Sequence, residues 1–219
     1  DEEIENFKPG TLARFGLDLA SLRADNPRLV TCSILGFARE GRHANRPGDD
    51  LVVQARGGLR SITGDADGPP RKTGVAIADI MTGMYATIAV LAALSEREKS
   101  GKGAFIDLAM LDTATAILSN QAMNHLVSGA TPVRRGNKHP NIQPQDVFPV
   151  RDGHIVLAVG NDEQFQRFAK AIGNPELAED PRYSTNRERV NNLDRLHPLI
   201  CERLAEKDLS DWIEIFNAE

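Results

Sequence analysis

One carboxylate combines a residue type and a position that covalent chemistry could use. Asp79 lies at the entrance of the most strongly predicted helix, residues 78–100, and Gly83 follows one turn later. A helix N-terminus favours negative charge because its N–H groups are unpaired and the helix dipole is positive there. A carboxylate held in this way, beside a residue without a side chain, is an available nucleophile. The same position is also typical of a helix-capping residue, so spacing alone leaves both interpretations open.

The histidines and cysteines form no second reactive cluster in the sequence. No pair among the histidines has the HxxxH or HExxH spacing of a metal site, so we expect no bound metal ion. His139 keeps more interest than the others because it lies between Asn137 and Asn141 in an irregular segment. Cys32 and Cys201 stand in apolar surroundings without CxxC spacing and away from a histidine or basic cluster. They are predicted to be buried free thiols in a reducing compartment.

Composition and charge restrict the kind of partner. The 219 residues are 41% hydrophobic and 26% charged, which is typical of a globular protein. The net charge of −5 argues against nucleic acid binding, which needs a concentrated basic patch. The longest apolar stretch, residues 85–94, is shorter than the roughly 20 residues of a membrane span. We therefore expect it to be part of a buried helix, and we expect no membrane partner.

Strand and helix patterns alternate in the first part of the chain. Hydrophobic periodicity predicts strand 28–37, helix 49–59, helix 78–100, strand 104–110 and helix 111–127. Gly101 directly follows the longest of these helices, as a typical helix stop. The alternation of strands and helices is typical of an α/β layer, so we expect an α/β domain over residues 1–128.

The second part of the chain follows a segment rich in proline and glycine. Residues 129–149 show little periodicity, and we expect residues 129–140 to be a linker. After it come a predicted strand at 154–160 and predicted helices at 163–172, 187–206 and 209–216. We therefore expect a smaller α+β domain over residues 141–219.

Several segments taken together resemble those of one enzyme family. They are ENFKPG at 5–10, NPRLV at 26–30, SILGF at 33–37, ADIMTG at 78–83, LAAL at 91–94, GKG at 101–103, DLAMLD at 107–112, DGH at 152–154 and GNDEQF at 160–165. No single motif is specific, but jointly they are, and they extend over essentially the whole chain. On these residues the chain resembles the family III CoA-transferases, also called the L-carnitine dehydratase/bile-acid-inducible (CaiB/BaiF) protein family.

The resemblance implies a reaction that residue spacing does not reveal. In this family the aspartate at the position of Asp79 attacks an acyl-CoA thioester, forming a mixed anhydride and releasing CoA thiolate. The thiolate then attacks the anhydride, the donor acid leaves, and an aspartyl-CoA thioester remains. An acceptor acid attacks that thioester, and the steps run in reverse to give the new acyl-CoA. This is covalent catalysis divided into easier steps.

The resemblance also implies roles for particular residues. Asn6, Phe7 and Arg14 match positions that hold the adenine and phosphates of CoA, and a guanidinium suits a phosphate because it can pair with it bidentately. Asp50 matches a carboxylate near the reaction centre. CoA and acyl-CoA are implied as substrates, and no permanently bound cofactor is implied.

The same family contains α-methylacyl-CoA racemases, which remove and return an α-proton and need an acid/base pair. The racemases have a His-Asp pair where this chain has Asp49-Asp50, and their second carboxylate would fall at Asp162. The missing histidine favours a transferase, because a carboxylate is a poor substitute for a base with a pKa near 7. A racemase-type enzyme and a non-catalytic fragment that binds CoA or a partner chain stay as alternatives.

Family members have a Rossmann-like large domain and a small domain, and two subunits interlock as a homodimer. By resemblance we expect residues 1–128 to be part of the large domain and residues 141–219 to be an incomplete small domain, because both chain ends look cut. Cut edges would expose apolar surface. Residues 137–144 replace the glycine run of formyl-CoA transferases and look closer to the dicarboxylate branch. Arg134, Arg135 or Lys138 would suit an acceptor with a second carboxylate. The expected location is the cytoplasm, or the mitochondrial matrix in a eukaryote.

Overall fold

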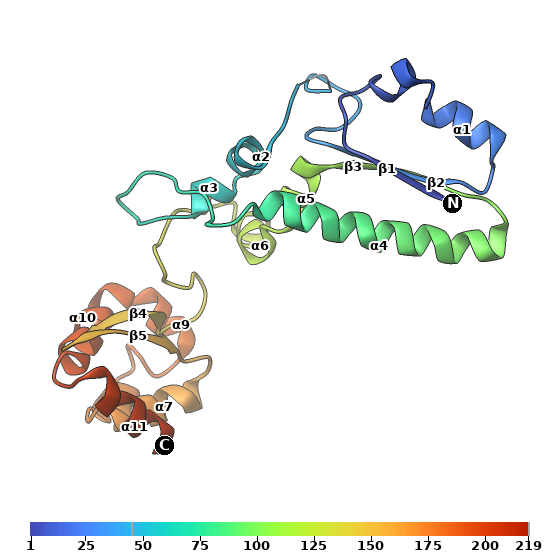
Figure 1. Cartoon of the computed structure of the whole chain (residues 1–219). Helices are drawn as coiled ribbons and strands as arrows, with labels where there is room; N and C mark the ends of the chain where they lie inside the picture. The colour runs from blue at the N-terminus through green and yellow to red at the C-terminus, as the bar shows by residue number, and fades with distance from the viewer. Residues whose placement is uncertain (45, 219) are drawn as a thin grey trace. The chain divides into compact units, whose positions relative to one another are not determined.

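The computed structural model describes residues 1–44 and 46–218, which form two compact units, Asp1–Arg134 and Arg135–Glu219 (Figure 1). The division between them falls inside the segment 129–140 that we expected to be a linker. The first unit contains a parallel sheet and the second an antiparallel strand pair, so the chain has the mixed α/β character expected from the sequence.

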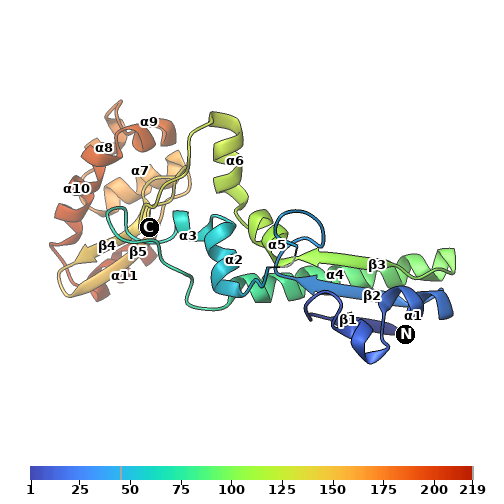
Figure 2. The same cartoon turned by 90° about the horizontal axis from the view of Figure 1, so that it is seen from above.

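The first unit is built on three parallel strands in the order β1 (Glu2–Glu5), β2 (Val30–Leu35) and β3 (Phe105–Ala109). Figure 2 shows them side by side. In register, Glu5 lies beside Ser33, and Ser33 beside Asp107. The central strand β2 is almost wholly buried, as its apolar sequence predicts. Because all three strands run the same way, their carboxyl ends meet at one edge of the sheet.

Helices cover this sheet and extend it at the carboxyl edge. The long helix α4 (Ile77–Ser100) follows one face, and α1 (Leu19–Asp25) lies on the other side (Figure 1). The shorter helices of the unit are η1 (Leu12–Phe15, a 3-10 helix), α2 (Asp50–Arg56), α3 (Leu59–Ile62), α5 (Met110–Ala116) and α6 (Ser119–Ser128). Helix α4 packs against β2, β3 and α5.

Helix α4 is much less buried than expected. Ile88 and Leu91, in the stretch predicted to be buried, are 62% and 61% exposed, and in α4 only Ala78, Thr82 and Ala86 are buried. The helix packs on the sheet through small residues, which leaves its large apolar side chains on the opposite face. Its length and composition would allow it to cross a membrane, contrary to our expectation of no such segment. One helix of this kind is weak evidence for a membrane protein.

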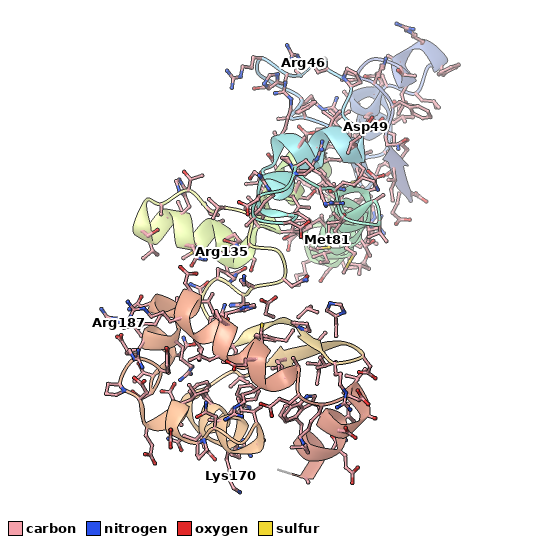
Figure 3. All side chains as sticks on the ribbon, turned by 90° about the vertical axis from the view of Figure 1, so that its left-hand side faces the viewer. Arg46, Asp49, Met81, Arg135, Lys170 and Arg187 are labelled. Atoms are coloured by element: carbon pink, nitrogen blue, oxygen red, sulfur yellow. The ribbon has the colours of Figure 1, made fainter. Side chains whose placement is uncertain are left out.

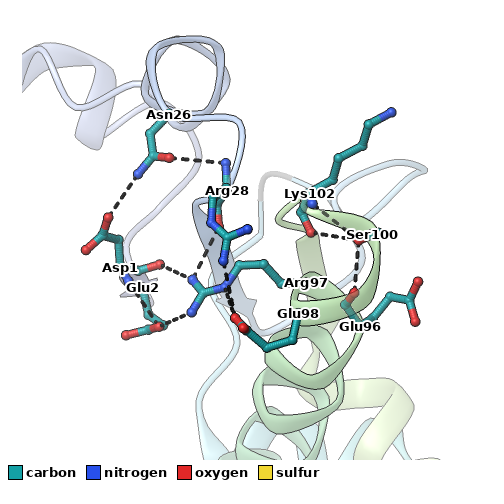
Figure 4. Close-up of polar contacts among 9 residues, drawn as sticks. All are labelled: Asp1, Glu2, Asn26, Arg28, Glu96, Arg97, Glu98, Ser100 and Lys102. Carbon is teal, nitrogen blue, oxygen red and sulfur yellow. Dashed lines mark hydrogen bonds and ion pairs between the residues drawn. The ribbon is translucent and has the colours of Figure 1, made fainter.

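The far end of α4 is fastened to the start of the sheet by Arg97 (Figure 4). Its guanidinium donates to the backbone carbonyls of Asp1 and Arg28, each at 3.3 Å, and contacts the Glu2 carboxylate at 3.4 Å. The helix then stops at Gly101, whose φ of 72° is the left-handed conformation that glycine adopts easily. The predicted end of this helix is therefore confirmed.

The second unit packs helices around the antiparallel pair β4 (Gln145–Val150) and β5 (Gly153–Ala158). Its helices are α7 (Asp162–Ala171), α8 (Glu176–Glu179), α9 (Asn186–Asn191), α10 (Leu193–Leu204) and α11 (Leu209–Ala218). Fully buried Phe165, Leu196 and Ile200 contribute to a continuous apolar core. Among these apolar side chains lies Arg189, which is also fully buried.

Some predicted elements were wrong in extent or missing. The predicted helix 111–127 is two helices, α5 and α6, and the predicted helix 187–206 is divided into α9 and α10. The segment 129–149, predicted to be irregular, contains all of β4 except its last residue, and Pro149 had hidden the strand pattern. Strand β1 and helix α1 were not predicted, because β1 is only four residues long and three of them are glutamates.

Candidate active site

Asp79 lies in the first turn of α4, as the sequence predicted. Its side chain is exposed, so it is accessible to a ligand. The residue before the helix, Ala76, provides no side-chain cap. The pKa of Asp79 is raised above the ordinary value for an aspartate, first by partial burial and then by the negative charges of Asp50 and Asp49. Three carboxylates are therefore gathered at the start of this helix.

Asp50 supplies the cap that the sequence around α4 lacks. Its Oδ1 accepts a hydrogen bond from the backbone N–H of Ala78 at 2.9 Å, and its Oδ2 accepts from Nε2 of Gln54 at 2.6 Å. The buried Gln54 in turn accepts from the backbone N–H of Thr73 at 3.1 Å. One carboxylate thus joins the first turn of α2 to the first turn of α4, and it fixes the backbone beside Asp79.

A hollow of about 250 Å³ lies at the carboxyl edge of the sheet. Asn6 and Phe7, just after β1, line it together with Gly36 and Phe37 after β2 and Met110 after β3. Ligands of parallel α/β sheets commonly bind outside this edge. The hollow also includes Arg46 and Gly48, which lead directly into the two aspartates at the start of α2; Figure 3 labels Arg46 and Asp49 in this region.

The structure separates the three residues expected to hold CoA. Asn6 and Phe7 line the same hollow, whereas Arg14 is an exposed residue of η1 and is not among the residues that line it. Sequence reasoning missed Lys8 and Arg46, whose basic side chains line the hollow instead. Lys8 directly follows Glu5, Asn6 and Phe7 in the sequence, and this adjacency could have identified it as a residue of the same site. Arg46 lay in an irregular arginine-rich loop, without any spacing to distinguish it.

Two glycines meet backbone to backbone where the hollow approaches α2. A Cβ atom on Gly36 would lie 2.4 Å from the Cα of Gly48, which is closer than real Cβ contacts. We expect Gly36→Ala to lower the free energy of unfolding by about 1–3 kcal/mol, as overpacking does. Gly74→Ala is the matched control, because nothing lies within 4 Å of its added Cβ. Chemical denaturation of both variants measures the difference, and equal stabilities would show that the glycine contact can relax.

In the second unit, Asp162 belongs to a network of hydrogen bonds. By resemblance this residue stands where a racemase has its second carboxylate. Its Oδ1 accepts from the buried Arg189 guanidinium at 2.8 Å and from the backbone N–H of Asn186 at 2.7 Å. Arg189 also donates to the backbone carbonyls of Gln143 and Tyr183. In the first unit, Asp49 caps α2 by accepting from the backbone N–H of Val52 at 2.9 Å.

The thiols differ in part from expectation. Both are free, but only Cys32 is buried, and Sγ of Cys201 lies 3.5 Å from Nδ1 of His197, so this thiol does stand beside a histidine. Burial raises the pKa of both thiols, which keeps them protonated. Within the described residues, no three His, Cys, Asp or Glu side chains group as metal ligands would.

Known proteins resemble this chain over most or all of its length. A succinate–glutarate CoA-transferase from Agrobacterium fabrum is 52% identical over 190 residues, which is 87% of this chain and 48% of that protein. The human succinyl-CoA:glutarate CoA-transferase is 38% identical over 99% of this chain and 49% of its own length. The crystal structure of a CaiB/BaiF family protein from Brucella suis matches all of this chain and 58% of its own, with 46% identity and a TM-score of 0.82.

The chain therefore spans about half the length of the curated relatives it matches. The family model for CoA-transferase family III matches residues 2–219. It does so over both compact units, including the hollow at the sheet edge and the carboxylates at the start of α4. The chain belongs to CoA-transferase family III.

Proposed function

We propose that the protein containing this chain transfers CoA from an acyl-CoA to a free carboxylic acid, with Asp79 as the nucleophile. The observation that carries the proposal is the exposed Asp79 carboxylate in the first turn of α4, in a chain whose relatives are named as CoA-transferases. The helix N-terminus favours negative charge at this position, but partial burial and the charges of Asp50 and Asp49 outweigh it and raise the pKa of Asp79. The hydrogen bond from Ala78 to Asp50 holds that first turn in place.

The proposed reaction begins when an Asp79 oxygen attacks the thioester carbonyl. The carbon–sulfur bond breaks, CoA leaves as a thiolate, and a mixed anhydride joins Asp79 to the acyl group. The thiolate then attacks the aspartyl carbonyl, which releases the donor acid and leaves an aspartyl-CoA thioester. The carboxylate of the acceptor acid attacks this thioester, and the same two exchanges in reverse free the new acyl-CoA and Asp79. Every step exchanges an acyl group between a carboxylate and a thiolate, so no external acid, base or oxidant is consumed.

We place CoA at the carboxyl edge of the parallel sheet, where Asn6 and Phe7 line the hollow beside Lys8 and Arg46. An aromatic side chain that is half exposed, as Phe7 is, can stack on a base, and the two cations suit phosphates. Arg14 does not line this hollow, and we propose that it binds a CoA phosphate that extends beyond it. No permanently bound cofactor is proposed.

The acceptor is proposed to be a small dicarboxylic acid. Relatives with 52% and 38% identity carry names in which succinate or its CoA ester is paired with glutarate. Arg134, Arg135 and Lys138 are candidates for recognising the second carboxylate, because cations in that segment could pair with it. A homodimer in the cytoplasm, or in the matrix of a mitochondrion, is proposed for the full-length protein on the family resemblance.

The α-methylacyl-CoA racemase is the second candidate, and two contacts argue against it. Asp162 is tied to the buried Arg189, and Asp49, which stands where a racemase has histidine, caps α2, so the side chains at both racemase positions already have structural partners. Incubation of the full-length protein with a branched acyl-CoA in heavy water tests this alternative. We expect no deuterium at the α-carbon, and its incorporation without exchange of CoA would support the racemase.

A trapping experiment tests the transferase directly. Full-length protein is incubated with succinyl-CoA, quenched with hydroxylamine and digested for mass spectrometry. An acylated aspartate, whether an anhydride or a CoA thioester, is converted by hydroxylamine to a hydroxamate. We expect the hydroxamate on Asp79 and only when the acyl-CoA is present. An active protein without a modified Asp79 would refute the proposed nucleophile, and a protein that binds CoA without activity or adduct would favour a non-catalytic CoA-binding role.

A further inference from the structure

A row of polar side chains crosses the sheet of the first unit just before the strands end. Glu5 closes β1, Ser33 lies beside it on β2, and Asp107 lies beside Ser33 on β3. Side chains in register on neighbouring strands project to the same face of a sheet. Arg39, from the loop after β2, spans the row: it donates to Ser33 Oγ and lies 3.7 Å from Glu5 Oε1 and 3.6 Å from Asp107 Oδ1. Arg39 also stacks over Phe105, with its guanidinium 5.1 Å from the ring centre.

Glu5 connects this polar row to the segment that lines the hollow. Its side chain is 8% exposed, and Oε1 accepts a hydrogen bond from the Ser33 hydroxyl. Oε2 accepts from the backbone N–H of Phe7 at 2.8 Å. The carboxylate therefore closes a tight turn over Asn6 directly after β1, and the rest of the row holds that carboxylate in place.

Three groups present hydrogen-bond donors to Glu5, while the Glu3 carboxylate on the same strand is a like charge close enough to interact with it. The three donors are the Phe7 N–H, the Ser33 hydroxyl and the Arg39 guanidinium. A carboxylate can accept hydrogen bonds from all three donors, because both of its oxygens are acceptors only. The amide of a glutamine has one oxygen and one NH₂ group, so it would direct an NH₂ donor toward at least one of these donors. The site is thus built for a carboxylate and not merely for a polar side chain.

We propose that Glu5 is a positioning residue for CoA: anchored by Ser33 and Arg39, it sets the conformation of the Asn6–Phe7 turn that lines the hollow. This inference rests on the proposed function, because the turn matters only if CoA binds there. Glu5 does not line that hollow, so its effect on the ligand passes through the backbone of Phe7. Loss of the carboxylate would release this turn while leaving the start of α4 and Asp79 unchanged.

The test is titration calorimetry of the full-length protein with CoA. We expect Glu5→Gln to raise the Kd for CoA about tenfold, as the loss of one hydrogen bond to a charged group would. The KM for acyl-CoA should rise in parallel, while kcat and the KM for the acceptor acid stay unchanged. Glu3→Gln is the matched control, with the same chemical change on the same strand and face but no bond to the turn.

Each outcome decides the inference. A Glu5→Gln protein that binds CoA as wild type does, or that is weakened no more than Glu3→Gln, would overturn the positioning role and leave the proposed function standing. A wild-type protein that does not bind CoA would overturn both. Should Glu5→Gln fail to fold, Glu5→Asp decides, because it keeps the charge but shortens the side chain by one methylene and so draws the carboxylate away from the Phe7 N–H. A raised Kd supports the inference, and an unchanged Kd refutes it.

Discussion

Replacing Asp79 with asparagine is expected to abolish CoA transfer, lowering kcat by roughly a thousandfold or more, as loss of a covalent nucleophile does. The amide has the shape of the carboxylate but is a far poorer nucleophile, so no anhydride can form. The Kd for CoA should stay near the wild-type value, because Asp79 does not line the hollow at the sheet edge. Steady-state kinetics on the full-length protein, with calorimetry for CoA, measures both quantities.

Asp112→Asn is the matched control for this change. Asp112 is also an exposed carboxylate in the first turn of a helix of the same unit, α5, so it reproduces the loss of charge at a helix start without the proposed chemistry. We expect it to retain wild-type kcat. If Asp79→Asn and Asp112→Asn lower kcat equally, or if Asp79→Asn still turns over, Asp79 is only an acidic residue in the first turn of a helix and not the nucleophile.

Local sequence signals predicted the helix that carries Asp79 but not what holds its first turn. The run of good helix formers and the stop at Gly101 were sufficient for α4, because both are properties of neighbouring residues. The cap from Asp50 comes from a side chain 28 positions earlier. No local pattern records such a contact. The motif resemblance predicts that Asp50 lies near the reaction centre, and the structure shows that it accepts a hydrogen bond from Ala78, the residue before Asp79.

The remaining surprises also depend on long-range contacts. Strand β1 lacks a strand-like sequence and exists because Glu2–Glu5 pair with the buried strand β2. The polar row across the sheet could not be foreseen, because it requires the register that aligns Glu5, Ser33 and Asp107. The burial of α4 was overestimated, because an apolar composition does not show which face of a helix packs against another element.

Two substitutions of Asp50 are expected to separate its effect on the backbone beside Asp79 from its effect on the pKa of Asp79. Asp50→Ala removes the acceptor for the Ala78 N–H, so we expect a loss of about 0.5–2 kcal/mol in the free energy of unfolding, as for a lost helix cap. It should also lower kcat, because the backbone beside Asp79 is no longer fixed. Asp50→Asn can keep one acceptor for Ala78 while removing the negative charge, so its main effect should be on the pH dependence.

The direction of that pH effect follows from the pKa of Asp79. Asp79 attacks as the carboxylate, so the rate rises with pH through its pKa, which burial and the neighbouring charges of Asp50 and Asp49 raise. Asp50→Asn removes one of these charges, lowers the pKa of Asp79 and moves the acid limb of the kcat/KM profile to lower pH. Asp49→Asn is the matched control: it removes the charge with the smaller influence and leaves the cap on α4 intact, so the limb should move the same way by less. An acid limb that stays in place in Asp50→Asn would mean that another group controls it.

Because burial is the largest cause of the raised pKa, neither variant should return the acid limb fully to the pH range of an ordinary aspartate.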